Sequence, residues 1–206
     1  MTEIRSAIAR ERTDLADLLT SLPAEDWDRP SLCAGWRVRE VVAHLTMAYR
    51  YSMPRVLVGI LRARGSFNRF SDRAARADAA RLSAADLTAC VRDNINHPWK
   101  PPGGGDVGAL SHDVIHGLDI TVALGIDRKV PPDHLRHVLG TVNPRHQKYF
   151  GVDLTGIQLK ATDLDWTYGT GRPLTGTAQD LLLVLCGRTL PRGSLTGTYA
   201  DRFTAG

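Results

Sequence analysis

The stretch Ser111-His112-Asp113-Val114-Ile115-His116-Gly117-Leu118-Asp119 decides how the rest of the chain is interpreted. It lies in a segment with helical periodicity from about residue 106 to 124. His112 and His116 are four residues apart, so their imidazoles lie one turn apart on the same helix face. Such a pair can bind one metal ion. The same spacing also suits surface histidines or histidines hydrogen-bonded within a core, and the pair alone leaves both interpretations open.

The composition is that of an ordinary globular protein. The chain has 206 residues, of which 43% are hydrophobic and 23% are charged, so we expect a real core in one large domain or one domain with an appendage. No apolar run reaches 18 residues and no signal-peptide pattern is present, so we expect a cytoplasmic protein without membrane association. Cys33, Cys90 and Cys186 are far apart, which argues against a disulfide framework.

The net charge of +4 raises the question of nucleic-acid binding. The basic residues are spread along the chain, with one denser arginine stretch between residues 50 and 81. No nucleic-acid recognition motif accompanies them. We therefore expect no nucleic-acid partner.

Four amphipathic segments predict helices over residues 2–22, 37–64, 83–95 and 106–124, with Pro54 interrupting the second. Four such helices joined by loops are what an antiparallel bundle needs. Residues 65–81 are polar and rich in arginine with little periodicity, so we expect a mobile or short-helical connection there.

The pattern changes after Pro131-Pro132. A short helix is predicted over 133–142, strands over 155–163 and 165–171, and a last helix over 181–186. We therefore expect a bundle domain over residues 1–150 and a small α+β segment over 151–206. The histidines around the expected domain boundary are predicted to lie at the surface: His134, His137 and His146.

A third candidate ligand, His44, lies in Glu40-Val41-Val42-Ala43-His44-Leu45. On a helical wheel it falls at the margin of the buried face formed by the valines and leucine. That position suits a ligand inside a bundle and equally suits a core histidine bonded to a neighbour.

Two segments resemble motifs of the mycothiol-dependent maleylpyruvate isomerase family: Leu32–Leu45, and His112-x-x-x-His116-Gly-Leu-Asp119 with Ala123-Leu124-Gly125. Residues 162–166 and 181–188 are similar to its C-terminal segment. The resemblance implies a mainly α fold, a DinB-like four-helix bundle with a small C-terminal α+β appendage. It also implies that His44, His112 and His116 bind zinc, or another divalent ion such as nickel. One departure is that His112 stands where the isomerase is thought to have a glutamate.

The resemblance implies a divalent-metal enzyme, an isomerase or thiol S-transferase, in which the open coordination position activates mycothiol. Its partners would be this low-molecular-weight thiol and a small electrophilic substrate. The alternatives are a zinc hydrolase that uses metal-bound water and a non-catalytic regulator that binds a metal or ligand. The sequence specifies neither the substrate nor the oligomeric state, for which a homodimer is one option, and it assigns no catalytic acid or base.

Several neighbouring residues are candidates for supporting roles. Asp119 and Glu40 lie within one turn of His116 and His44, where a carboxylate can orient an imidazole or bind the metal; Glu40 also suits the helix N-terminus. Trp99 and Tyr49 are expected to border the open position and bind substrate or cofactor. Cys33, by contrast, is expected to be a small buried thiol.

Overall fold

The computed structural model describes residues 2–205, apart from the side chain of His146. Contacts within the chain divide it into two compact units, which meet in sequence between Leu124 and Gly125. The expected boundary, after residue 150, falls inside the second of these units. The segment from 125 to 150 therefore groups with the C-terminal part of the chain, because its helices α7 (Pro132–Leu139) and α8 (Pro144–Phe150) contact α9 (Ala178–Leu185) there.

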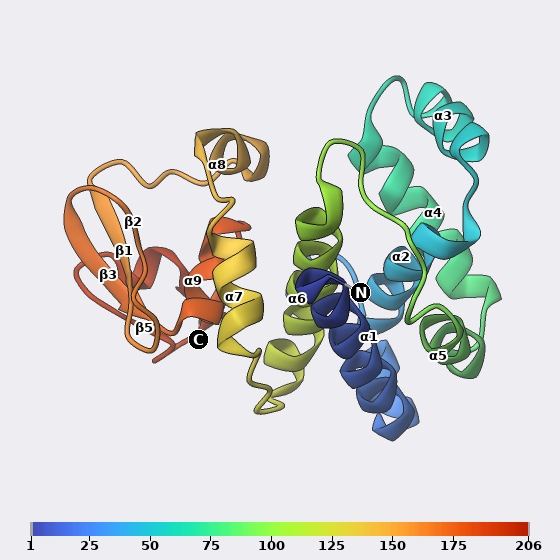
Figure 1. Ribbon diagram of the computed structural model, residues 1–206, viewed down its shortest axis with the longest axis horizontal. Helices are drawn as coiled ribbons and strands as arrows, with labels where there is room; N and C mark the ends of the chain where they lie inside the picture. The colour runs from blue at the N-terminus through green and yellow to red at the C-terminus, as the bar shows by residue number, and fades with distance from the viewer. Residues whose placement is uncertain (1, 206) are drawn as a thin grey trace. The chain divides into compact units, whose positions relative to one another are not determined.

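The first unit is a helical bundle (Figure 1). It includes α1 (Glu3–Ser21), α2 (Val38–Arg50), α5 (Ala84–Asp93) and α6 (Gly105–Leu124), and a short 3-10 helix, η1 (Ala24–Asp28), follows α1. α1 contacts α5 and α6, and α2 contacts α5 and α6. The apolar stripes predicted from the sequence meet in a core that includes Leu15, Leu19, Val38, Val41, Leu45, Leu87, Val91 and Ile120. The predicted mainly α bundle is confirmed.

The start of α2 follows the expected capping pattern. Arg37 has an extended backbone, and its N–H donates to the Glu40 carboxylate at 2.8 Å. This bond satisfies a backbone donor that the first helical turn leaves without an intrahelical partner. The cap fixes where α2 begins and hence the helix face on which His44 lies.

The segment predicted to be a mobile or short-helical connection is one helix of 15 residues, longer than the helical alternative anticipated, and the mobile alternative was wrong. After α3 (Met53–Arg62), residues Phe67–Arg81 form α4, which packs along α2. Its buried face is made largely of small or polar side chains: Ser71, Ala75, Asp78 and Ala79, with Phe70. Hydrophobic periodicity detects large apolar residues, and this face has only one.

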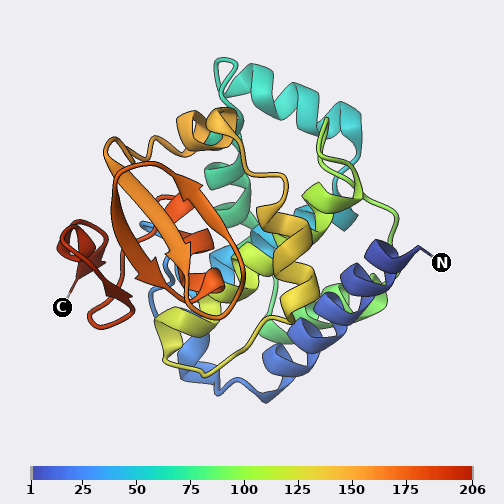
Figure 2. The same cartoon turned by 60° about the vertical axis from the view of Figure 1, so that its left-hand side comes forward.

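The second unit is a small α+β assembly (Figure 2). It comprises α7 (Pro132–Leu139), α8 (Pro144–Phe150), β1 (Ile157–Ala161), β2 (Thr167–Gly169), β3 (Arg172–Gly176), α9 (Ala178–Leu185), β4 (Leu190–Pro191), β5 (Leu195–Thr196), η2 (Ala200–Arg202) and β6 (Thr204–Ala205). One sheet has the order β2-β1-β3-β5, and β4 pairs with β6.

The β1 strand confirms the predicted alternation, since Ile157, Leu159 and Ala161 are its buried residues. β1 and β3 run parallel, with α9 contacting both of them. His134 is fully buried on α7, which corrects its predicted surface position, whereas His137 is partly exposed. The side chain of His146 lies outside the described part of the chain. No helix among residues 2–205 combines the length and apolar character needed to cross a membrane.

Candidate metal centre

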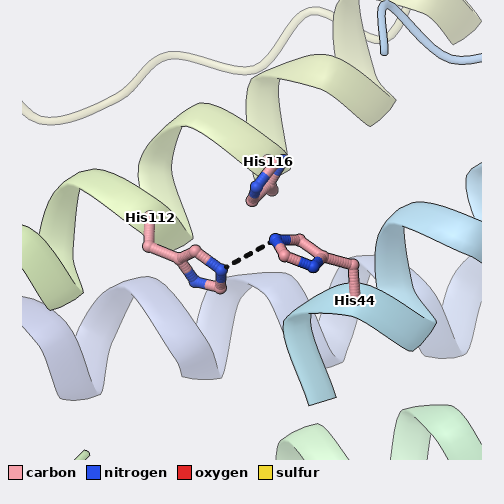
Figure 3. A group of neighbouring side chains, drawn as sticks. All are labelled: His44, His112 and His116. Atoms are coloured by element: carbon pink, nitrogen blue, oxygen red, sulfur yellow. Dashed lines mark hydrogen bonds between the residues drawn. The ribbon is translucent and has the colours of Figure 1, made fainter. Parts of the chain in front are cut away.

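Three histidines predicted to act together lie together in the first unit (Figure 3). His112 and His116 project from α6 toward His44 on α2. The ring centroids of each pair are 4.9–5.2 Å apart, and one ring nitrogen of each histidine lies within 4.8 Å of the others. The Nε2 atoms of His44 and His112 are 3.3 Å apart. All three rings are only partly buried, so small molecules can reach this cluster, which we call the histidine triad.

Each triad ring is held at Nδ1 by an oxygen atom. Ser71 Oγ lies 2.9 Å from His44 Nδ1, Asp113 Oδ1 lies 3.2 Å from His112 Nδ1, and Asp119 Oδ2 lies 2.9 Å from His116 Nδ1. An acceptor at Nδ1 places the proton there and leaves the lone pair on Nε2 for a metal. The two carboxylates therefore select the Nδ1–H tautomer of His112 and His116, and the Ser71 hydroxyl, which can donate or accept, can accept from His44 Nδ1 in the same way.

The carboxylate beside His112 is itself fixed by a buried arginine. Arg12 Nε donates to Asp113 Oδ2 at 2.8 Å, and both side chains are 1% exposed. The same guanidinium donates to three backbone carbonyls of the loop after α5, those of residues 94, 95 and 97. Arg12 on α1 thus joins the loop to the residue that orients His112.

The carboxylate beside His116 has a second polar partner. Cys33, which is buried, donates its S–H to Asp119 Oδ2 at 3.0 Å, and its sulfur is 3.9 Å from His116 Nδ1. Cys33, His116 and Asp119 form a second set of donor atoms within 4.8 Å of one another. Cys33 is buried, as expected from the sequence. The sequence did not indicate that its thiol contacts Asp119, the carboxylate that orients His116.

Aromatic rings border the triad. Trp99 lies 5.1 Å from the His112 ring between centroids, and Trp36 lies 5.3 Å from that of His44. Tyr49 contacts the His97 ring at 5.3 Å and lies under the Arg12 guanidinium. Burial, and then the nearby Asp113 carboxylate, raise the pKa of the Tyr49 hydroxyl, so this phenol stays protonated at neutral pH. Trp99 is the nearer of the two predicted binding residues to a triad ring.

Glu40 is engaged at the helix N-terminus. Its carboxylate accepts from the backbone N–H and the guanidinium of Arg37. Burial alone would raise the pKa of this carboxyl, but the hydrogen bonds from Arg37 hold it below its usual value. The structure thus favours the capping role for Glu40 over the imidazole-orienting role, which belongs to Ser71 for His44.

The sequence interpretation missed most of the residues that support the triad. Asp113 was detectable, since it directly follows His112 in a helix. Ser71 and Arg12 gave no local signal, because they lie 27 and 101 residues from their partners. Only the folded packing of α1 and α4 brings them to the site.

Comparison with known proteins finds a matching family model and similar solved structures. Residues 8–97 match the family model described as the mycothiol maleylpyruvate isomerase N-terminal domain. This match includes His44 but ends before α6. No curated protein matches the chain.

Two solved structures are similar over 97% of this chain and 97% of their own. One is a mycothiol-dependent maleylpyruvate isomerase in which a histidine is mutated to alanine, with a TM-score of 0.61 and 13% identity. The other is a crystal structure of the mycothiol-dependent maleylpyruvate isomerase, with a TM-score of 0.53 and 14% identity. At this identity the likeness establishes the fold. The family resemblance and the fold class predicted from the sequence are both confirmed.

Proposed function

We propose, starting from the match of residues 8–97 to the mycothiol maleylpyruvate isomerase N-terminal domain family, that the chain is a divalent-metal enzyme that uses mycothiol to isomerise a small electrophilic substrate. His44, His112 and His116 would hold the metal. Zinc is the leading candidate because imidazole nitrogen is among its preferred ligands, and nickel is the alternative. The observation that carries the proposal is the convergence of three imidazoles whose Nδ1 atoms are all bonded to oxygen.

The distance between two of the triad nitrogens suits a metal ion. Two nitrogens bound at 2.0–2.1 Å to a tetrahedral ion are about 3.3–3.4 Å apart, and the Nε2 atoms of His44 and His112 are 3.3 Å apart. Three protein ligands with one position left open are typical of catalytic zinc sites, whereas structural sites are closed by four. The number and type of donors therefore fit an open site.

A metal bound there would supply charge that lowers the pKa of a coordinated thiol, which keeps the sulfur nucleophilic at neutral pH. Residues around the triad would orient the imidazoles, balance charge and contact the substrate or the thiol. Ser71, Asp113 and Asp119 hold the imidazole rings at Nδ1, and the Arg12 guanidinium balances the buried charge of Asp113. Trp99 offers an apolar contact beside His112 for the substrate or the thiol.

The first experiment is elemental analysis of untagged protein. We expect one divalent metal ion per chain in the wild type and almost none in His112→Ala. His137→Ala is the matched control, because this histidine is partly exposed and lies in the second unit. Equal metal content in all three proteins would contradict the assignment of the triad as the metal site.

The second experiment separates the candidate reactions. The metal-loaded protein is incubated with maleylpyruvate, with and without mycothiol, and the products are identified by mass spectrometry. Isomerisation that requires the thiol supports the proposal. A stable thiol conjugate would indicate an S-transferase, and thiol-independent cleavage of the substrate by water into two products would indicate a hydrolase. Stoichiometric metal without turnover of any electrophile tested would favour a regulator.

A further inference from the structure

A cavity is lined by residues of α3, α4 and the start of the segment before them, in the first unit. The two helices contact one another and lie side by side in Figure 1. The volume of the cavity is about 540 Å³, and its lining includes Tyr51, Arg55, Val58, Arg62, Phe70 and Arg73. We call it the α3–α4 groove. None of the triad histidines or the residues bonded to them lines it, so ligand binding in the groove does not depend on the proposed function.

The groove has an excess of positive charge. Arg55, Arg62 and Arg73 are exposed, and among the residues that the structure describes none of them forms an ion pair with a carboxylate. The sequence has no acidic residue from Tyr51 to Ser71. Three guanidinium groups around one hollow, without a counter-charge from the protein, favour an anionic ligand.

The two acidic residues of α4 already have partners, and among the described contacts these partners do not include Arg55, Arg62 or Arg73. Asp72 binds the Trp36 indole N–H at 2.8 Å and forms an ion pair with Arg76. Asp78 binds Arg50 at 2.7 Å, and it also accepts from Tyr51 and Arg81. These contacts leave the positive charge of the groove uncompensated.

The rest of the lining is apolar. Phe70 is 7% exposed and its ring lies directly against α3 at Gly59, where an added Cβ would collide with the ring. Tyr51 presents its ring beneath the Arg55 guanidinium, whose carbon is 3.6 Å from the ring centroid. Val58 lies at the exposed edge. An aromatic or short alkyl body would contact these surfaces while its charged group reaches the arginines.

We propose that the α3–α4 groove binds a small organic anion, one whose apolar body lies on Phe70 and Val58 and whose carboxylate or phosphate group is held by Arg55, Arg62 and Arg73. A phosphate or carboxylate accepts parallel hydrogen bonds from guanidinium groups. The apolar lining distinguishes this ligand from inorganic phosphate, which would use only the arginines.

The test is calorimetric titration with 1-naphthylphosphonate, a dianion with an aromatic body that cannot be hydrolysed to phosphate. We expect saturable binding of one molecule per chain, with inorganic phosphate and 1-naphthol each binding at least about tenfold more weakly. The double variant Arg62→Gln/Arg73→Gln should weaken binding roughly tenfold or more, since one hydrogen bond to a charged group is worth about that factor. The matched control is Arg172→Gln/Arg192→Gln, which removes two exposed arginines from the second unit and should bind like the wild type.

Two further variants locate the bound anion. Val58→Glu places a carboxylate at the exposed edge of the groove without disturbing the core, and it should also weaken binding. His112→Ala should leave binding intact, because the triad does not line the groove. If 1-naphthylphosphonate binding survives in the arginine variant and disappears in His112→Ala, the anion occupies the triad and the proposal is refuted.

A different ligand for the same surface would be an anionic membrane. α3 exposes Met53, Leu57 and Leu61 beside the basic residues, a pattern that also occurs in helices that bind anionic lipid surfaces. The proteins are therefore sedimented with phosphatidylglycerol vesicles. Vesicle binding that depends on Arg62 and Arg73, without saturable binding of 1-naphthylphosphonate, would overturn the proposal in favour of a membrane surface. Equal affinity for inorganic phosphate and 1-naphthylphosphonate would overturn it as well, because the apolar body would then contribute nothing.

Discussion

The ion pair between Arg12 and Asp113 gives the sharpest test of what holds the triad in place. We consider Arg12→Met, which keeps much of the aliphatic length of the side chain and removes the guanidinium. The change leaves the Asp113 carboxylate 1% exposed without its 2.8 Å partner. It also removes the donor for three carbonyls of the loop after α5.

The expected loss of stability is large. Breaking a buried ion pair by removing one partner costs about 3–5 kcal/mol, because an uncompensated charge stays buried. The lost carbonyl bonds add to this figure. Asp113→Asn alone should cost roughly 2–4 kcal/mol, since it leaves the arginine charge without its carboxylate. The double variant should lose clearly less than the sum, with a coupling energy of about 2 kcal/mol.

A double-mutant cycle isolates the ion pair from the carbonyl bonds. These bonds are absent in both Arg12→Met and the double variant, so their contribution cancels in the coupling energy. The free energy of unfolding is measured in urea on metal-free protein. Tryptophan fluorescence is followed in a Trp166→Phe background, so that the signal comes from the first unit. Additivity within ~0.5 kcal/mol would show that the two side chains do not stabilise each other and would refute the reasoning.

The metal ligands, their supporting residues and the α2–α4 contact can each be tested separately. A chelator should lower the melting temperature of the wild type but not of His112→Ala, since a ligand that binds only the folded state stabilises it; identical melting in all four conditions would show that no metal stabilises the fold. Asp119→Asn should weaken metal affinity about 10–100-fold in competition with a fluorescent chelator, because the amide no longer holds a proton on the imidazole as a carboxylate does; unchanged affinity would remove Asp119 from the site. Trp99→Ala should raise KM at constant metal content and kcat, and a loss of metal would mean that the residue is structural. Burial alone would raise the pKa of the Asp78 carboxyl, but hydrogen bonds, above all from Arg50, hold it below its usual value. The stabilisation by Asp78 is therefore present above about pH 4, the pKa of an unfolded aspartate, and is lost as the pH falls toward the lower folded pKa. Asp78→Asn should flatten the acid limb of the unfolding free energy against pH, and an unchanged limb would contradict the assignment.

The sequence predicted the triad because its signals are local or lie within one motif. His112 and His116 share one helix at a spacing that sets their geometry, and His44 lies in a segment with a recognisable pattern. The strand over Ile157–Ala161 was predicted for a similar reason, since alternation places one face inward. In each case the prediction depends on residues that are only a few positions apart in the sequence.

The parts that the sequence did not predict depend on packing between distant segments. α4 buries Ala75 and Ala79 against α2, and alanine gives almost no amphipathic signal. The burial of His134 likewise follows from the packing of α7, which its own sequence does not specify. A buried charge such as Arg12 is found only once its partner is known, because composition places arginine at the surface.

The three triad histidines also differ in whether the residue bonded to Nδ1 is near to them or distant in the sequence. On α6 each ligand is accompanied by its own carboxylate, Asp113 beside His112 and Asp119 three residues after His116. These two imidazoles are therefore oriented within a single helix. His44 instead depends on Ser71 of α4, so this contact holds its ring only while α4 packs against α2. The buried face of α4 consists mainly of small or polar side chains. The orientation of the third candidate ligand is therefore tied to the stability of the α2–α4 contact.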